Sequence, residues 1–546
     1  MEQSDRAELV ATLTRPPGED GGALAALAGR ASWLEVRADL AGDLDPAALR
    51  REFPGGLLYT LRSRAEGGRG ENDPAARQER LLAAAAAGWD LVDLEGERDL
   101  DPALLDRLAP ERRLLSWHGQ DADLPALQRR FAAMARTPAR LYKLIPTAVR
   151  PGQALAPLQL LAALGRRDLI AFAAGSQGAW TRTVAPRLGA PWVYGAAGDR
   201  PGAPGQPTIA RLARDYGLPA LPPAAGLCGV VGHPVGHSLS PRLHNGAYRA
   251  LGLPLVYVAF ETERFGDFWI EVVESGAFEG LGMPLVGLSI TAPFKRAALA
   301  VAGAASPRAE TIGAANTLVL RDGVWEAECT DPEGVLLPLV RRGVALNGVP
   351  AAVVGAGGAG RAAAFALDRA GARVTLVNRT EEGGREAAAT LGVGFEPLAG
   401  FDPGRFRLVV NATPALPFDP ARLAPGAAVV EMTYRSAADS PLLAAAHAGG
   451  AVAIDGREVL LYQALGQFRL MAGRELPEAL GRRLLGLDRT QPDGPGGEPD
   501  DAGSRHSDGV RPVDPAGTGG SASGGSPTAG VESARPAGAA GGEEAR

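Results

Sequence analysis

The sequence predicts an α/β protein that is built mainly on parallel sheets and ends in a disordered tail, and three observations support that prediction. Over residues 1–222, eight strand patterns alternate with helical ones, which is typical of a closed eight-stranded barrel. At residues 351–370 a β-branched strand, a glycine turn and an alanine-rich helix follow one another, as in a second parallel α/β unit. From Gln491 onward the chain has three valines and no leucine, isoleucine, methionine or aromatic residue, so we expect a disordered tail.

Composition indicates several domains and no charge-driven partner. The chain has 546 residues, of which 46% are hydrophobic and 22% charged, and a net charge of −6. Neither nucleic acid nor an acidic membrane should attract it. Cys228 and Cys329 make no disulfide framework and suit a reducing compartment. The N-terminus lacks signal-peptide features and no apolar run could span a bilayer, so we expect a cytoplasmic protein.

The expected barrel strands are short apolar runs separated by helical stretches such as Arg77–Ala87 and Leu155–Leu164. These strands are Leu9–Leu13, Trp33–Val36, Leu57–Leu61, Asp90–Leu94, Arg113–Trp117, Arg140–Ile145, Leu169–Ala173 and Trp192–Tyr194. Polar side chains gather toward their carboxyl ends, where barrel enzymes carry their chemistry. They are Glu35, Arg37, Arg62, Glu95, His118, Lys143 and Arg182.

Only two of the 56 basic residues are lysines, Lys143 and Lys295. Lysine can lose its proton and act as a nucleophile or acid, whereas arginine cannot. Lys143 lies in an apolar strand, where it must pair, extend toward water or react, and desolvation would free its amine for Schiff-base chemistry. His118 is either a satisfied buried histidine or the partner of that lysine. Arg62 and Arg182 are either salt-bridge partners or ligands of a substrate carboxylate.

A series of further motifs follows in a fixed order. They are Glu35-Val36-Arg37, Thr60-Leu61-Arg62 through Glu66-Gly67-Gly68, Ser116-Trp117-His118, Lys143, Gly175 through Arg182, and Ala203-Pro204-Gly205-Gln206. With them this half resembles type I 3-dehydroquinate dehydratase. The resemblance implies a TIM barrel in which Lys143 forms an imine with the 3-keto group, His118 shuttles protons and Glu66 assists it. It implies that the substrate is bound by Glu35, Arg37, Arg62, Arg182 and Gln206. Gly119, Thr181 and Gly202 depart from the family pattern.

The second half opens after a proline-rich linker with the strand Leu227–Val231 and a loop from Gly232 to Pro241. The loop and the helix that follows hold three histidines without an acidic or cysteine ligand beside them, so a polyol or carboxylate ligand is favoured over a metal. Lys295, Asn316 and Asp331 each follow an apolar strand and should converge at strand ends. Lys295 is either a surface charge or, with Asp331, a proton donor.

The glycine turn predicts a nucleotide site. Gly355 would make the tight turn, Gly357 would let the backbone approach a pyrophosphate, and Gly360 would let helix and strand pack. The next strand, Arg373–Val377, carries no acidic residue for a ribose hydroxyl. It ends in Asn378-Arg379-Thr380, and an arginine there suits the extra phosphate of NADP. A plain glycine turn and a solvated arginine are the alternatives.

Residues 227–487 resemble shikimate dehydrogenase through these motifs, the stretch Glu431–Leu443 and the stretch Gln463–Gly473. The resemblance implies that shikimate is bound by Ser238, Ser240, Thr291, Asn316, Asp331, Tyr434 and Gln463, and that Lys295 with Asp331 does the acid/base work. It implies that NADP(H) is bound by Gly355, Ala356, Gly357, Gly358, Ala359, Gly360, Asn378, Arg379 and Thr380. Ser289, Cys329 and Glu431 depart from the family pattern.

Together these resemblances imply a bifunctional enzyme of aromatic amino acid biosynthesis that dehydrates 3-dehydroquinate and reduces the product to shikimate with NADPH. We expect a barrel at 1–224, a dehydrogenase at 225–487 and a tail at 488–546. Within the dehydrogenase, residues 227–335 and 455–487 form the substrate lobe and residues 336–454 form the Rossmann NADP lobe. We expect small-molecule substrates and no metal, nucleic acid or membrane partner, with a homodimer left open.

Two other functions remain open at this point. The second half could oxidise quinate with NAD in a catabolic role, against which Ser238, Ser240 and Arg379 argue. The chain could instead be a ligand-sensing regulator built on inactive copies of both enzymes. Inactive copies are expected to lose catalytic residues, and those of both halves are present.

Overall fold

The computed structural model describes residues 6–18, 24–71, 73–120, 123–434 and 440–488. Their strands form one eight-stranded and two six-stranded sheets, which follow one another along the chain. The predicted α/β fold class is therefore confirmed, with one mixed sheet among the three. The tail expected to be disordered lies outside the described residues, apart from Asp488. No helix in the described part of the chain is long and apolar enough to cross a membrane.

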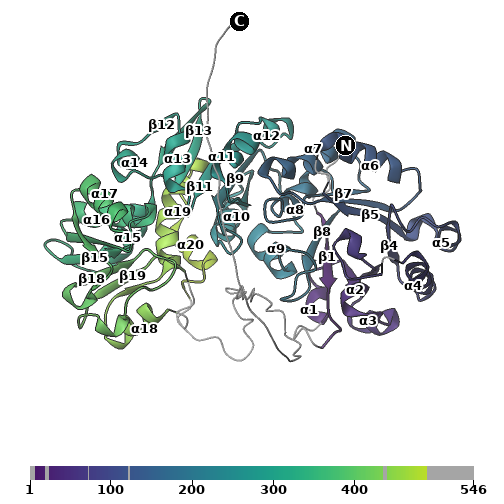
Figure 1. The fold of residues 1–546 in the computed structure, drawn as a ribbon, viewed down its shortest axis with the longest axis horizontal. Coiled ribbons are helices and arrows are strands. Elements are labelled where there is room, and N and C mark those ends of the chain that lie inside the picture. Colours follow the sequence, from purple (N-terminus) through teal and green to yellow (C-terminus); the bar gives the residue numbers. More distant parts are fainter. Residues whose placement is uncertain (1–5, 19–23, 72, 121–122, 435–439, 489–546) are drawn as a thin grey trace, which may run out of the picture. The chain divides into compact units, whose positions relative to one another are not determined.

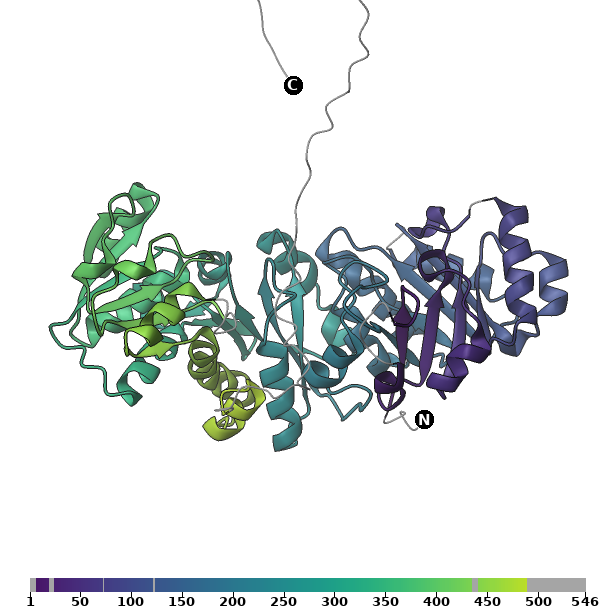
Figure 2. The same cartoon turned by 90° about the horizontal axis from the view of Figure 1, so that it is seen from below.

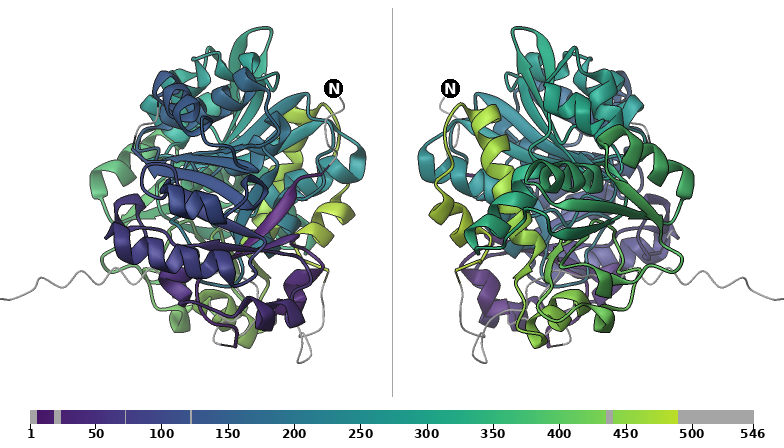
Figure 3. Two further views of the ribbon diagram at one scale, coloured as in Figure 1. Left: turned by 90° about the vertical axis from the view of Figure 1, so that its right-hand side faces the viewer. Right: turned by 90° about the vertical axis from the view of Figure 1, so that its left-hand side faces the viewer.

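The first sheet is parallel throughout and has the order β7-β6-β5-β4-β3-β2-β1-β8, seen as purple and blue strands in Figures 1 and 3. Its strands are β1 (Glu8–Leu13), β2 (Trp33–Arg37), β3 (Gly56–Thr60), β4 (Leu91–Glu95), β5 (Arg113–Gly119), β6 (Leu141–Pro146), β7 (Leu169–Ala171) and β8 (Trp192–Ala196). All eight strands expected from the sequence are present, with some ends shifted. Because their side chains are buried on both faces, they read as nearly continuous apolar runs.

Helices separate these strands. They are α1 (Leu24–Ala28), α2 (Ala38–Ala41), α3 (Pro46–Glu52), α4 (Pro74–Ala86), α5 (Pro102–Arg107), α6 (Leu124–Met134), α7 (Leu155–Leu164), α8 (Thr181–Val184) and α9 (Ile209–Tyr216). The starts of α3, α4 and α5 share one local signal, an aspartate followed by proline. In each, the carboxylate of Asp45, Asp73 or Asp101 accepts a backbone N–H of the first turn. The following proline has no N–H to lose.

The barrel is nearly closed, and no strand ladder joins β7 to β8 among the described strands. In the described part of the chain these are the two edge strands of the sheet. Residues that follow β7 contact β8 instead: Arg182 Nη1 of α8 donates to the Tyr194 carbonyl oxygen at 3.3 Å. The rings of Phe172 and Tyr194 lie 6.5 Å apart. The sequence predicted a closed barrel, and it did not show that β7 would have only three residues.

The second sheet is mixed and has the order β10-β9-β11-β13-β14-β12. Its strands are β9 (Gly226–Gly232), β10 (Leu255–Glu261), β11 (Leu285–Ile290), β12 (Ala304–Ala305), β13 (Thr317–Arg321) and β14 (Val324–Glu328). Its helices are α10 (Ser240–Leu251), α11 (Phe265–Phe268), α12 (Ala277–Gly280), α13 (Lys295–Val301), α14 (Pro307–Ile312) and α15 (Asp331–Arg341). The antiparallel hairpin β13–β14 turns at Asp322-Gly323, both with positive φ, as an Asp-Gly hairpin turn requires.

Two late helices return to this sheet. They are α19 (Gly456–Ala472) and α20 (Glu478–Leu484), drawn in yellow-green beside α10 in Figure 2. Their apolar residues, such as Leu461 and Phe468, share one core cluster with Tyr248 of α10 and Tyr257 of β10. The chain therefore leaves this lobe for the third sheet and comes back to complete it.

The third sheet is fully parallel with the order β17-β16-β15-β18-β19-β20. Its strands are β15 (Pro350–Val354), β16 (Arg373–Asn378), β17 (Gly394–Pro397), β18 (Leu408–Asn411), β19 (Ala428–Glu431) and β20 (Ala453–Ile454). Helices α16 (Gly358–Arg369) and α17 (Glu381–Leu391) lie on one side and α18 (Pro441–Ala448) on the other (Figure 1). This is the doubly wound order, whose ligand crevice lies at the carboxyl ends of the central strands, next to the glycine turn.

Candidate active sites

Lys143 lies inside the barrel on β6, with its side chain 6% exposed. Its Nζ is 3.5 Å from Glu35 Oε1 and 3.9 Å from the centre of the Tyr194 ring. Burial lowers the pKa of Lys143, and the Glu35 carboxylate opposes that shift. A buried amine with a lowered pKa is a stronger nucleophile at neutral pH than an exposed lysine.

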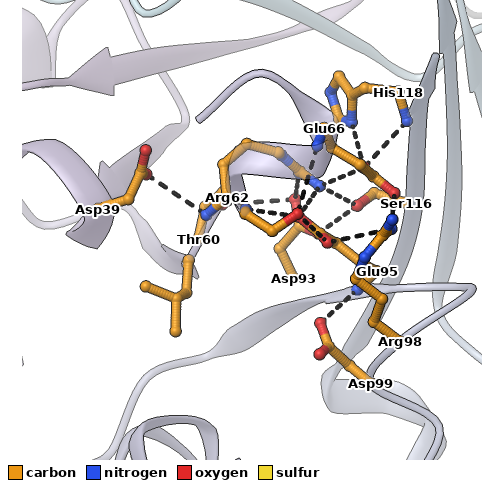
Figure 4. Close-up of polar contacts among 12 residues, drawn as sticks. Asp39, Thr60, Arg62, Glu66, Asp93, Glu95, Arg98, Asp99, Ser116 and His118 are labelled. Carbon is orange, nitrogen blue, oxygen red and sulfur yellow. Dashed lines mark hydrogen bonds and ion pairs between the residues drawn. The ribbon is translucent and has the colours of Figure 1, made fainter. Parts of the chain in front are cut away.

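His118 and Glu66 form a pair at the end of β5. His118 Nδ1 lies 3.1 Å from Glu66 Oε2, and the His118 backbone N–H donates to the same oxygen at 3.0 Å (Figure 4). Burial lowers the pKa of His118 well below its usual value, and the cations Arg62 and Lys143 add to the effect. The imidazole is therefore neutral at physiological pH. With a proton on Nδ1 donated to Glu66, its Nε2 is left as a base.

Arg62 is surrounded by carboxylates (Figure 4). Its guanidinium lies 2.9 Å from Glu66, 2.8 Å from Asp93 and 3.1 Å from Glu95. Burial is the largest influence on Glu66 and raises its pKa to about 7. Arg62 opposes that shift, whereas Glu95 and Asp93 add to it. Because three acidic groups occupy Arg62, its donors already have partners before any substrate is considered.

Two members of this network, Asp93 and Arg98, were not predicted from the sequence. Asp93 accepts from Ser116 Oγ at 2.5 Å, and Arg98 Nη1 lies 3.3 Å from Glu66 Oε1. The sequence did contain a signal for Asp93. Apolar and acidic residues alternate in Val92-Asp93-Leu94-Glu95, and residues two apart in a strand lie on one face, so Asp93 and Glu95 share a face of β4. Nothing along the chain marked Arg98, which follows the end of β4 in a loop.

Arg182 has the opposite environment. It is 2% exposed and has no carboxylate within ion-pair distance among the described residues. Its Nε also lacks a hydrogen-bond partner there. Burial alone lowers its pKa to about 10. A buried guanidinium without a counter-charge is costly unless a ligand supplies one, so Arg182 is the better placed of the two arginines to receive a carboxylate.

The remaining predicted barrel residues form one chain of hydrogen bonds. Arg37 pairs with Asp39 at 2.7 Å and donates to the Gly202 carbonyl at 2.8 Å. The Gln206 side chain accepts from the Gly202 N–H and donates to Thr12 Oγ1. Thr12 Oγ1 in turn donates to the Glu35 carboxylate at 2.8 Å. A side chain at Gly202 would meet Thr12 Cγ2 at 2.7 Å, so a larger residue there would need a rearranged loop.

Lys295, Asp331, Asn316 and Gln463 converge in the second sheet, although they come from four separate segments. Lys295 Nζ lies 2.5 Å from Asp331 Oδ2. Asn316 Nδ2 donates to Asp331 Oδ1 at 2.9 Å and to Gln463 Oε1 at 3.1 Å. Cys329 Sγ lies 4.0 Å from Asp331 Oδ2, and burial raises the pKa of its thiol. The cluster joins an amine to a carboxylate beside the amide groups of Asn316 and Gln463.

A second polar group lies around α10. Tyr434 hydrogen-bonds Ser238, and Tyr257 hydrogen-bonds Ser240. Tyr257 also donates to Ser289 Oγ at 2.6 Å, and Ser289 donates to Gln467 at 3.0 Å. Gln467 donates in turn to the Asn316 carbonyl at 3.0 Å, which links the two groups. The sequence analysis did not assign a role to Tyr257 or Gln467.

The loop histidines and Thr291 are placed separately. His244 is fully buried and stacks on Tyr257 with 4.2 Å between ring centres. His233 lies 3.6 Å from Glu261, and the His237 ring is 6.3 Å from that of Tyr434. Thr291 follows β11 in the turn that leads to Lys295, where its carbonyl accepts the Phe294 N–H at 3.0 Å.

The glycine turn has the geometry that its spacing predicted. Gly355 has φ +107°, and a Cβ at Gly360 would lie 1.8 Å from the Gly355 oxygen. A Cβ at Gly357 would meet no atom within 4 Å, so its backbone is open to a ligand at the start of α16. A Cβ at Gly358 would lie 2.8 Å from Lys295 Cβ, which places the turn directly against the lysine.

The strand after the turn fits a phosphorylated ribose. Asn378 Oδ1 accepts from the Ala356 N–H at 3.2 Å, and Asn378 Nδ2 donates to the Thr380 carbonyl at 2.8 Å. Arg379 is exposed and has no ion pair with another described residue. Arg385, in contrast, pairs with Glu381 at 3.0 Å. An open turn, a helix N-terminus and a free guanidinium suit a dinucleotide with an extra phosphate.

The second half matches the family model of the shikimate dehydrogenase substrate binding domain over residues 230–318. It is similar to the shikimate dehydrogenase (NADP(+)) of Syntrophobacter fumaroxidans, with 36% identity over 264 residues, 46% of this chain and 89% of that protein. The chain belongs to the shikimate dehydrogenase family. The shikimate dehydrogenase (NADP(+)) of Halobacterium salinarum is 39% identical over 269 residues, 47% of this chain and 97% of that protein.

The first half carries a type I 3-dehydroquinase domain, whose family model matches residues 17–220. A relative that combines both enzymes matches most of this chain. It is the bifunctional 3-dehydroquinate dehydratase/shikimate dehydrogenase of Arabidopsis thaliana, 28% identical over 488 residues, 82% of this chain and 79% of that protein. Both resemblances expected from the sequence are confirmed.

Proposed function

We propose that the chain catalyses two consecutive reactions. The barrel dehydrates 3-dehydroquinate to 3-dehydroshikimate, and the second half reduces that product to shikimate with NADPH. The observation that carries the proposal is that each half holds its own lysine with ionisable partners. One is a buried amine near a histidine–glutamate pair, and the other is a lysine–aspartate pair against a glycine turn. The relatives that cover each half are named for these activities.

In the barrel, the neutral amine of Lys143 is the proposed nucleophile at the keto carbon. Loss of water gives an iminium, which withdraws electrons from the neighbouring C–H bond. His118 removes that proton and returns one to the departing hydroxyl, and Glu66 holds the imidazole for both transfers. Water then adds to the product iminium and its C–N bond breaks, which releases 3-dehydroshikimate and the Lys143 amine. Arg182 would take the substrate carboxylate because it has no carboxylate partner among the described residues. Glu35, Arg37, Arg62 and Gln206 would contact the remaining polar groups.

In the second half, Lys295 is the proposed proton donor to the carbonyl oxygen, and its ion pair with Asp331 holds the amine in place. NADPH supplies the hydride when it is bound. The residues that would hold it are Gly355, Ala356, Gly357, Gly358, Ala359, Gly360, Asn378, Arg379 and Thr380. Shikimate would contact Ser238, Ser240, Thr291, Asn316, Tyr434 and Gln463. The domain limits expected from the sequence, 1–224 and 225–487, are part of the proposal.

Without NADPH, the full chain should convert 3-dehydroquinate to 3-dehydroshikimate, which is measured by its enone absorbance. Once NADPH is added, shikimate should form. Lys295→Ala should stop NADPH oxidation while dehydration continues and 3-dehydroshikimate accumulates. The physical reason is that Lys295 belongs to a polar group separate from that of Lys143. Loss of both activities in a folded variant would refute the assignment of one reaction to each half.

The alternative role in quinate oxidation is tested with the same protein. Arg379 is exposed and has no ion pair within the described part of the chain, which favours NADP over NAD. Assays of both substrates with both cofactors would decide. We also propose a cytoplasmic location, supported by the two free, buried cysteines. Sedimentation would test whether the chain forms a homodimer.

A further inference from the structure

Tyr194 lies inside the barrel and has no role in the function proposed above. It belongs to β8 and is 3% exposed. Lys143 Nζ lies over its ring, 3.9 Å from the ring centre. Its backbone carbonyl accepts from Arg182 Nη1 at 3.3 Å. Tyr194 therefore contacts both the proposed nucleophile and the arginine proposed to hold the substrate carboxylate.

The hydroxyl of Tyr194 has no hydrogen-bond partner among the described residues. Buried phenols usually find one, because an unpaired buried hydroxyl is unfavourable. Two other buried barrel tyrosines follow that rule: Tyr59 donates to Asp43 at 2.6 Å, and Tyr142 donates to the Thr137 carbonyl at 3.0 Å. The exception is the tyrosine whose ring lies against Lys143.

Burial and the nearby carboxylates keep the Tyr194 hydroxyl protonated. Burial raises its pKa well above the usual value, the Glu35 and Asp93 carboxylates add to the shift, and Arg62 opposes it. Neither carboxylate accepts a hydrogen bond from it. The phenol is thus a donor at working pH, and the keto, carboxylate and hydroxyl oxygens of the proposed substrate are all acceptors.

We propose that Tyr194 is a further catalytic residue of the dehydration, an inference that rests on the function proposed above. Its hydroxyl donates a hydrogen bond to the keto oxygen while Lys143 Nζ bonds to the keto carbon. As the N–C bond forms, the C=O π electron pair moves onto the oxygen, and the phenol stabilises the growing negative charge. The oxygen then takes the proton released by the new ammonium centre, so Tyr194 ends the step unchanged.

Tyr194→Phe tests this directly, because it keeps the ring against Lys143 and removes only the hydroxyl. Full-length protein is mixed with 3-dehydroquinate in a single turnover, quenched with borohydride at set times, and the Lys143 adduct is measured by mass spectrometry. We expect adduct formation to slow roughly 100- to 1,000-fold, the range for loss of one oxyanion donor, with little change in KM. The melting temperature should stay or rise, because the hydroxyl lost has no hydrogen-bond partner among the residues that the structure describes.

Tyr142→Phe is the matched control. It makes the same change beside Lys143 on β6 but removes a hydroxyl that is bonded to the Thr137 carbonyl. It should lower the melting temperature and leave the rate of adduct formation unchanged. Adduct formation at the wild-type rate in Tyr194→Phe, or a rise in KM alone, would overturn the role of Tyr194. Absence of a Lys143 adduct in the wild type would instead overturn the proposed dehydration chemistry.

Discussion

Glu66 places a carboxylate where the folded barrel disfavours its charge, so Glu66→Gln should stabilise the barrel above neutral pH. Burial, with Glu95 and Asp93 adding to it and Arg62 opposing it, raises the pKa of Glu66 to about 7. The unfolded chain ionises near the ordinary value of 4.5. Because the folded pKa is the higher one, the stability linked to the protonated form is complete below the unfolded pKa. It is lost as the pH rises through about 7.

The structure sets the size of this effect. The Glu66 side chain is 2% exposed, so water screens it little. A rise in pKa from 4.5 to about 7 corresponds to roughly 3 kcal/mol of unfolding free energy lost between acidic and mildly alkaline pH. Glutamine carries no charge to ionise, so the variant should match the wild type near about pH 5 and exceed its stability near about pH 8. Dehydratase activity should fall in the same variant, because His118 loses its carboxylate.

Urea unfolding followed by tryptophan fluorescence measures this difference, since five of the seven tryptophans lie in the barrel. These are Trp33, Trp89, Trp117, Trp180 and Trp192. Glu97→Gln is the control, because Glu97 lies nearby with its side chain 49% exposed. A pH dependence of stability that is the same in the wild type and Glu66→Gln would show that the folded barrel does not hold Glu66 above its ordinary pKa.

Three further predictions follow from single contacts. Arg98→Ala removes a cation 3.3 Å from Glu66, so the dehydratase rate should begin to rise at a higher pH than in the wild type. Arg98→Lys should restore the wild-type pH profile, and an unchanged profile in Arg98→Ala would contradict the role of Arg98. Arg379→Ala should narrow the preference for NADPH roughly tenfold, mainly through its KM, whereas equal use of NADH and NADPH by the wild type would refute the role of Arg379. Gly358→Ala forces a Cβ to 2.8 Å from the lysine of the second site and should impair reduction but not dehydration. Gly383→Ala, which meets no neighbour, should affect neither, and equal rates for both variants would contradict the clash.

Much of the fold could be predicted from the sequence because it depends on neighbours along the chain. Strand runs in the barrel, the glycine turn at Gly355 and the Asp-Pro helix starts are local patterns, and the structure has all of them. The scarcity of lysine also singled out Lys143 and Lys295, because they are the only two side chains of the sequence that carry an amine.

Only the tertiary structure decided how the polar residues are used. Arg62 and Arg182 were equivalent in the sequence, yet the fold surrounds one with carboxylates and leaves the other without any among the described residues. The same is true of Tyr194, which looked like one more apolar strand residue. Charge pairing and hydrogen bonding depend on distances of a few ångströms between residues far apart in the chain. Those distances are set by how the strands close and pack, which no local pattern contains.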